Sequence, residues 1–501
     1  MDTPSTTIRR YLLQQRSTDT AIPCKDSRGQ HNKETEKTRI VHQDIQSLAT
    51  TETHYTKSKE TGRRYLPFQT TIKSLYKAYL KRQISENPGK PTVSYSQYLK
   101  IFNAYNIGIA PPLTDTCNNC NLLKNKIDEL REKEPNNLEA LNINKRDLNL
   151  HKFRAKRVVR LYNTFLPPER RSKFYNEKLK LKYDYKPNRL VICMDLAQAR
   201  PIPQITESLA YYKRKLMLYI FGIYDVINDV SYMFTWTEVE AKRGSNEIAS
   251  CLSVFIDKFV SPHIDNLVIF SDNCAGQNKN INIVLSCLRF IHSNRFKKID
   301  HVFMMSGHSY MPCDRDFGFI SRSIKGETIP SYRKYIQLIQ DAKPGKPFRV
   351  VKMKQNMFKN FDKLQKLIVN RKPADHDINF SDGKIFTFSS DYKLGYHIKT
   401  HYSNLLPPVP VILQREGVAR KGSKKPTLYL DSFNLFVDLD PLYDAPVKLS
   451  SAKLDDIKCL LEHVKYNEKE FLQGVVSSQD GAVDFQIEGY ADYNDRMIDF
   501  N

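Results

Sequence analysis

Three aspartates stand where regular elements should begin or end, and together they could hold metal ions. Asp195 interrupts the apolar run "RLVICMDLAQ", where a buried carboxylate is costly unless a charged partner compensates it. Asp272 follows the apolar run "NLVIFS", and Asp314 comes at the start of a helical pattern. Two Mg²⁺ or Mn²⁺ ions among three carboxylates could activate a water or a 3′-hydroxyl and stabilise the leaving oxygen in phosphoryl transfer. The types and positions of these residues therefore predict a two-metal catalytic site.

Each acid also has a simpler interpretation. An aspartate after a strand is commonly a turn or cap residue, and Asp272 is followed by Asn273. Asp314 has Asp316 two residues further on, and either could cap a helix. Asp195 is harder to explain in this way, because the sequence around it is apolar and carries no turn signal. The metal hypothesis depends on all three acids meeting in space.

Polar side chains near two of these acids could assist the same chemistry. The stretch "FSDNCAGQNKN" supplies Asn273, Gln277 and Asn278, whose uncharged amides could orient a phosphate or a metal-bound water. His308 precedes Asp314 by a few residues and could orient the scissile phosphate or transfer a proton. The alternative for His308 is a buried structural histidine.

The motif "DTCNNC" predicts a second, different metal site. Cys117 and Cys120 have the C-x-x-C spacing that lets two thiolates grip one zinc ion, which normally takes four Cys or His ligands. His151, on a later helical segment, is the best candidate for a third ligand, and the sequence offers no obvious fourth. A redox pair and two ordinary cysteines are the alternatives.

The order of elements between residues 186 and 345 predicts how the acids could converge. Runs rich in β-branched and aromatic residues alternate with helical patterns in the order strand, strand, strand, helix, strand, helix, strand, helix. Three strands in an antiparallel meander, followed by strands joined through helices, give a mixed sheet covered on both faces. This is the order of a ribonuclease H-like α/β fold, in which the first and fourth strands are neighbours and the last helix packs over that edge.

The flanking regions have other compositions. Residues 1–60 are polar without apolar periodicity, which predicts a disordered arm. Residues 61–185 carry helical apolar spacing around the cysteine motif and could include a DNA-binding module. Residues 346–405 contain further strand-like runs that would extend the core, and 406–501 comprise a Pro-rich linker, helices and an acidic tail.

Charge and composition indicate the class of partner. The chain of 501 residues has 78 Lys and Arg against 55 Asp and Glu, a formal charge of +23 that favours a polyanion such as DNA over a small-molecule substrate. No run approaches the roughly 20 apolar residues needed to span a bilayer, so no membrane partner is expected. Nine scattered cysteines suit a reducing compartment, and "RKGSKK" (420–425) could serve as a nuclear import signal.

Several stretches resemble a large family of animal proteins thought to derive from DDE/D-type DNA transposases with a ribonuclease H-like core. They are "MDLAQ", "YYKRKL", "YIFGIYD", "FSDNCAGQNKN" and "GHSYMPCDRDF", preceded by "DTCNNC", and the resemblance covers roughly residues 90–400. It implies that Asp195, Asp272 and Asp314 are the family's acidic positions, with aspartate where many such enzymes have glutamate as the third acid.

These observations lead to one functional hypothesis and two alternatives. The first is a Mg²⁺-dependent transposase-like nuclease and strand-transferase, for which a homodimer is expected by analogy because transposition brings two DNA ends together. The second is a domesticated, non-catalytic DNA-binding protein that retains the fold. The third is a nuclease of the same chemistry that acts on RNA or on particular nucleic-acid structures.

Overall fold

The computed structural model of the protein divides into two compact units, with the boundary between Thr114 and Asp115. The described residues are 35–48, 64–66, 70–86, 92–105, 107–109, 117–172, 174–368, 378–403, 406–413 and 434–479. The predicted helical region 61–185 is therefore shared between the two units. Most of the predicted arm 1–60, the basic segment 420–425 and the acidic end of the chain lie outside the described residues.

The first unit is a small helical assembly. Its helices are α2 (Glu36–Ser47), α4 (Ile72–Glu86) and α5 (Tyr95–Ala104), and a short parallel pair joins β1 (Arg64–Leu66) to β2 (Ile107–Ile109). The two helices predicted by apolar spacing, α4 and α5, are confirmed. Their buried tyrosines and phenylalanine pack with residues of α2 in one core.

Helix α2 corrects the prediction that residues 1–60 form a disordered arm. Its Val41 and Ile45 are four residues apart and pack into the core of the first unit. The buried Asp44 between them accepts hydrogen bonds from the Arg82 guanidinium and from the Tyr98 hydroxyl. The helix thus depends on tertiary partners, which explains why its polar sequence gave little local signal.

The second unit is built on a ten-stranded mixed sheet. Its central strands are β3 (Arg189–Leu196), β5 (Leu216–Asp225), β6 (Val230–Thr237), β7 (Asn266–Ser271) and β8 (Lys298–Phe303). They lie side by side in the order β6-β5-β3-β7-β8. The pairs β6–β5 and β5–β3 are antiparallel, whereas β3–β7 and β7–β8 are parallel. The predicted meander and the predicted contact between the first and fourth strands are both confirmed.

Later strands extend this sheet at both edges. Strand β9 (Arg349–Lys352) pairs with β6, and β10 (Ile385–Ser389) pairs with β8. Beyond β10 lie β11 (Tyr392–Lys399) and β12 (Val409–Ile412), while β4 (Arg200–Ile202) pairs with β5. The strands in 346–405 are therefore continuous with the core sheet.

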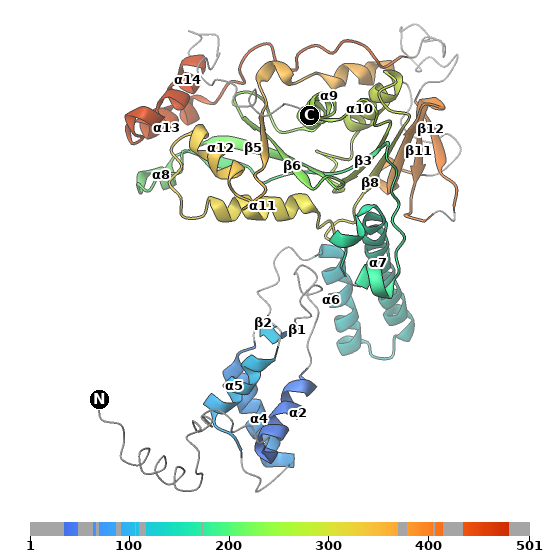
Figure 1. The fold of residues 1–501 in the computed structure, drawn as a ribbon, viewed down its shortest axis with the longest axis vertical. Helices are drawn as coiled ribbons and strands as arrows, with labels where there is room; N and C mark the ends of the chain where they lie inside the picture. The colour runs from blue at the N-terminus through green and yellow to red at the C-terminus, as the bar shows by residue number, and fades with distance from the viewer. Residues whose placement is uncertain are drawn as a thin grey trace, which may run out of the picture. The chain divides into compact units, whose positions relative to one another are not determined.

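Helices cover both faces of the sheet (Figure 1). On one face, α9 (Ser245–Phe259) and α10 (Ile281–His292) pack on strand residues such as Ile192. The opposite face is covered by α11 (Pro312–Ser323) and α12 (Tyr332–Gln340). Ser245 is the first residue of α9 and does not cap it. Gly244 precedes the helix, and the Ser245 hydroxyl accepts a hydrogen bond from Asn282.

The remaining helices flank the sheet. Helices α6 (Asn118–Lys133) and α7 (Leu138–Phe165) pack against each other, and the C-terminal part of α7 contacts the sheet through Val158 and Phe165. The short α8 (Leu209–Tyr212) precedes β5. Helices α13 (Ser451–Glu462) and α14 (Glu470–Gln479) join the core around α12. Short helical turns occur at Pro168–Arg170, Phe174–Lys178, Gln355–Met357, Phe361–Leu367, Phe380–Asp382 and Tyr466–Glu468.

None of the described helices combines the length and the apolar character needed to cross a membrane.

Candidate catalytic and metal sites

Strand β3 places Asp195 on the face of the sheet that α11 covers. Alternate residues of a strand point to opposite faces, and Val191 and Cys193 pack with residues of α7 and α11. Asp195 continues this alternation and is half-buried. Burial raises the pKa of its carboxyl group to about 8, with further contributions from the charges of Asp272 and Asp314.

Asp272 follows β7 and lies level with Asp195. In the parallel pair β3–β7, Met194 is opposite Ser271, so the next residue of each strand is an aspartate. The Oδ1 atom of Asp272 accepts a hydrogen bond of 3.1 Å from the backbone N–H of Cys274 and one of 2.7 Å from Asn278 Nδ2. The bond from Cys274 closes an Asx turn. Asp272 therefore also has the turn-forming role that is the simpler explanation of an aspartate after a strand.

Asp314 lies in the first turn of α11 and combines two roles. Its Oδ2 atom accepts a hydrogen bond of 2.7 Å from the backbone N–H of Met311, as a helix-capping carboxylate does. Burial raises the pKa of Asp314, and the nearby charge of Asp272 raises it further. Asp316 is completely buried and accepts a hydrogen bond of 2.7 Å from the Ser231 hydroxyl, so it belongs to the packing of α11 on β6.

On this face of the sheet the charges of Asp272 and Asp314 therefore act on Asp195, and the charge of Asp272 acts on Asp314. Their ligand oxygens are not gathered closely enough to count as a metal-binding group. Among the described residues, the only group of three or more Cys, His, Asp or Glu side chains with ligand atoms close enough to share a metal ion is a cluster of Cys and His.

The side-chain amides after Asp272 are buried or half-buried, and they contact the loop itself. Asn278 is fully buried and donates to Asp272, so it orients the carboxylate. The Oδ1 atoms of Asn273 and Asn278 are buried and have no hydrogen-bond donor among the described residues. The backbone carbonyl of the half-buried Gln277 accepts a hydrogen bond of 2.8 Å from Asn280.

Two further residues that the sequence did not single out are buried, one beside the end of β7 and one in the loop that follows it. His301 is buried in the neighbouring β8, and its Nε2 atom lies 2.8 Å from the Ser271 hydroxyl. Burial lowers the pKa of His301 to about 3, so the ring is neutral. Lys279 is buried and donates to two backbone carbonyls, those of Ser381 and Gly383. The charge within "QNKN" was the available signal for Lys279, because a lysine that cannot reach water must find acceptors.

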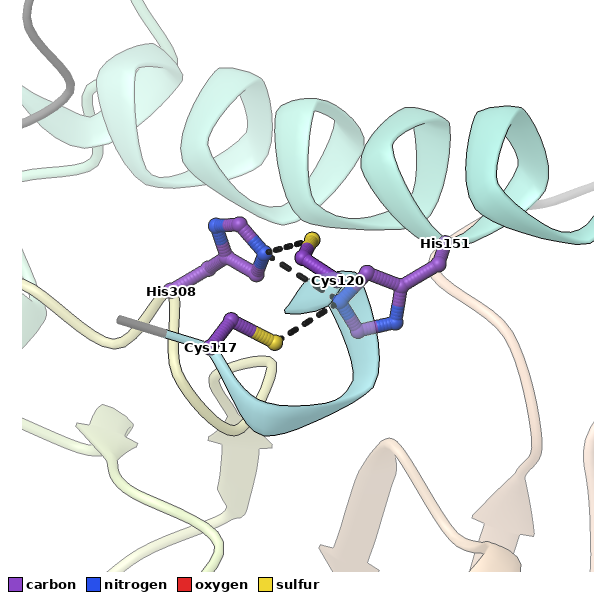
Figure 2. A group of neighbouring side chains, drawn as sticks. All are labelled: Cys117, Cys120, His151 and His308. Carbon is purple, nitrogen blue, oxygen red and sulfur yellow. Dashed lines mark hydrogen bonds between the residues drawn. The ribbon is translucent and has the colours of Figure 1, made fainter. Parts of the chain in front are cut away.

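The Cys and His cluster is formed by the start of α6, the middle of α7 and the loop between β8 and α11. Figure 2 shows Cys117, Cys120, His151 and His308 pointing toward one another. The ligand atoms of these four side chains all lie within 4.8 Å of one another. Cys117 Sγ is 3.2 Å from His151 Nε2, Cys120 Sγ is 3.4 Å from His308 Nε2, and the two Nε2 atoms are 3.1 Å apart. This group can hold a metal ion such as zinc.

The ionisation of the cluster responds to its burial. Burial lowers the pKa of His151, and the positive charge of Arg154 lowers it further, which favours the neutral imidazole that binds metals. Burial raises the pKa of Cys120, as does the neighbouring Cys117, because two thiolates repel each other when no cation lies between them.

The structure places His308 differently from the sequence prediction. The sequence predicts that this histidine acts beside the carboxylates, but its imidazole lies in the Cys and His cluster. There it is the fourth side chain, for which the sequence offered no obvious candidate. His308 is 188 residues from Cys120 along the chain. Spacing along the chain could not reveal that Cys120 and His308 meet. The only hint of a ligand in the sequence was a histidine in the loop after a buried strand.

A family model described as a domain of unknown function, DUF7869, matches residues 210–399. The match spans β5 to β11 and includes Asp272, His308 and Asp314, whereas Asp195 and the cysteine motif precede it. No curated protein and no solved structure matches the chain.

Proposed function

We propose that the protein cleaves and joins DNA phosphodiesters with the help of Mg²⁺ or Mn²⁺, through Asp195, Asp272 and Asp314. The observation that carries the proposal is that the charges of Asp272 and Asp314 act on Asp195, and that the charge of Asp272 acts on Asp314. Burial and like charge raise the pKa of two of them, a pattern that favours the binding of cations. Functional sites commonly concentrate groups whose pKa is perturbed by burial together with a specific charged neighbour.

The strand order supports the ribonuclease H-like form of the α/β fold. An antiparallel meander β6-β5-β3 continued by the parallel strands β7 and β8 is the arrangement expected for that fold. In it, one acid lies in the first strand, the second follows the fourth strand, and the third lies on the final helix. This topology accounts for the positions of all three aspartates at once.

The chemistry would divide between the acids and the ions. Asp195 and Asp272, level on adjacent parallel strands, would bind or bridge the ions, and the carboxylate oxygen of Asp314 that is not engaged in capping would complete the site. Bound ions would supply an activated nucleophile and stabilise the leaving oxygen. Asn278 would hold the Asp272 carboxylate in one orientation through its 2.7 Å hydrogen bond.

Positive charge beside this face supports DNA as the substrate. Helix α7 packs on the same face as Cys193 and Phe270. Its outer side carries exposed basic residues, namely Arg146, Arg154, Lys156 and Arg160. Basic side chains of this kind neutralise phosphates and do not read sequence, so the predicted binding is strong at low salt and tolerant of sequence.

The test is metal-dependent cleavage and strand transfer by the purified full-length protein on plasmid and oligonucleotide DNA. Wild type should act with Mg²⁺ or Mn²⁺, and Asp272→Asn should lose activity while it still folds and binds DNA. Asp128→Asn, which changes an exposed aspartate of α6, is the matched control and should remain active. Salt-sensitive DNA binding without cleavage under any of these conditions would refute the catalytic proposal in favour of a domesticated DNA-binding protein. Cleavage restricted to RNA would refute DNA as the substrate.

A further inference from the structure

Two thiols and two imidazoles converge at a site that the proposed nuclease chemistry does not use. A tetrahedral zinc ion with sulfur at about 2.3 Å and nitrogen at about 2.0 Å separates its ligand atoms by roughly 3.3 to 3.8 Å. Three of the six ligand-atom distances in the cluster are 3.1, 3.2 and 3.4 Å, and all six are within 4.8 Å, so a small movement of the side chains gives the size that zinc requires. Two Nε2 atoms that face each other at 3.1 Å can form a hydrogen bond only if one of them carries the proton, whereas both can bind a metal.

We propose that Cys117, Cys120, His151 and His308 bind one structural zinc ion that fixes the loop leading to Asp314. With four protein ligands the coordination sphere is closed, and no position remains for a water or a substrate. The ion therefore stabilises the fold and does no chemistry on a substrate. The proposal does not depend on the nuclease activity.

The packing around the site shows why this region needs an ion. The hydrophobic cluster between α6 and the N-terminal half of α7 has four buried members, and two of them are Cys117 and Cys120. Among the described residues, its only buried aliphatic side chains are Ile127 and Leu148, with Leu123 and Leu141 partly buried against them. So small a core stabilises a helical pair weakly, and small protein cores are commonly supplemented by a structural metal. Binding of zinc would add its free energy to the folding of this pair.

The loop between β8 and α11 is already pressed against the cysteine motif. Gly307 has a φ of 73°, and a Cβ atom at this position would lie 2.6 Å from Cys117 Cβ. The thiol of Cys117 also contacts the Ser306 carbonyl at 3.6 Å. A side chain at position 307 would push this loop away, so the close approach requires glycine.

This loop connects the zinc site to the proposed catalytic face. His308 lies between β8 and Pro312, the first residue of α11, and Asp314 is in the first turn of that helix. His151 and His308 are 157 residues apart, so the ion would cross-link distant segments and reduce the freedom of both. We infer that zinc positions Asp314 indirectly by anchoring the N-terminus of α11.

Zinc content of the purified full-length protein tests the binding claim. Elemental analysis should give one zinc per chain in wild type and in the controls His263→Ala and Cys459→Ser, which change a histidine and a cysteine outside the cluster. Cys120→Ser and His308→Ala should lose the ion, whereas His308→Cys should retain it because thiolate is an equivalent ligand. Substitution of Co²⁺ into wild type should give the absorption bands of a tetrahedral thiolate site, a readout that needs no variant to fold.

The positioning claim is tested by hydrogen exchange before and after zinc removal with a chelator. Exchange should increase in 304–316 and around the start of α6, and it should remain unchanged in β5 and β6. Absence of zinc from wild type after reconstitution, or full zinc content in Cys120→Ser, would overturn the binding claim. Unchanged exchange in 304–316 would overturn the positioning claim. Asp272→Asn should retain its zinc, so a failure of the nuclease proposal would leave this result intact.

Discussion

Replacing Asp195 by asparagine should stabilise the Mg²⁺-free protein at alkaline pH. The folded protein holds the proton of Asp195 up to about pH 8, because burial, Asp272 and Asp314 disfavour the carboxylate. The unfolded chain releases the same proton near the ordinary aspartate pKa of 3.8. Between these two values the unfolded state binds fewer protons, so the free energy of unfolding must fall as the pH rises. The stability contribution is fully present below about pH 4 and is lost by about pH 8.

The size of this effect follows from the pKa difference. A tenfold change in proton affinity corresponds to about 1.4 kcal/mol, so the rise in the pKa of Asp195 from 3.8 to about 8 gives an upper bound of roughly 6 kcal/mol. Water reaches this half-buried carboxyl group, and the neighbouring acids can share its proton. We therefore expect the asparagine variant to exceed wild type by on the order of 2 kcal/mol near pH 8 and to match it near pH 4.

Urea unfolding followed by tryptophan fluorescence measures this difference. The chain has one tryptophan, Trp236, which is buried in β6, so its emission reports on the central sheet. Asp128→Asn on the exposed surface of α6 is the control and should follow wild type at every pH. Added Mg²⁺ or Mn²⁺ should stabilise wild type near pH 8 more than it stabilises Asp195→Asn.

A constant difference in the free energy of unfolding between Asp195→Asn and wild type across this pH range would refute the raised pKa of Asp195. That result would mean that the carboxyl group of Asp195 titrates normally and that the three acids do not interact. Equal stabilisation of both proteins by Mg²⁺ would refute the role of Asp195 as a ligand.

Two further predictions concern residues that hold the end of β7. Asn278→Ala removes the 2.7 Å hydrogen bond to Asp272 and should lower the free energy of unfolding by about 1 to 2 kcal/mol in the same fluorescence assay, whereas Gln277→Ala should have little effect. His301 has its pKa lowered to about 3, below the ordinary value of 6.5, so its contribution to stability is present above about pH 6.5 and is lost as the pH falls toward 3. His301→Gln should weaken this acid dependence of the urea midpoint, and an unchanged pH profile would contradict the assignment of a neutral buried ring.

The sequence by itself determined the local elements of the second unit, and it placed Asp195 in a strand and Asp314 at the start of a helix. Apolar runs and helical spacing reflect which side chains each element must bury, and this requirement acts over a few residues. The α/β class and the meander followed by parallel strands came from element order alone.

Only the tertiary structure decided which distant residues meet. Helix α2 is stabilised by partners on α4 and α5, and its own sequence is too polar to indicate packing. The strands after residue 346 pair with both edges of one sheet. An edge strand offers unpaired backbone N–H and C=O groups that carry no sequence information, so the sequence could not show which strand pairs with which edge.

The clearest case is His308. Its sequence neighbour Asp314 suggested a role at the carboxylates, but the loop after β8 turns at Gly307 and brings the imidazole to Cys120, 188 residues away. Ligand geometry is a property of positions in space, and spacing along the chain predicts it only when all the ligands share one short motif. Here the C-x-x-C turn satisfied that condition for two ligands, and the sequence offered His151 as a candidate for the third. The packing of α6, α7 and the β8–α11 loop supplied the fourth, His308.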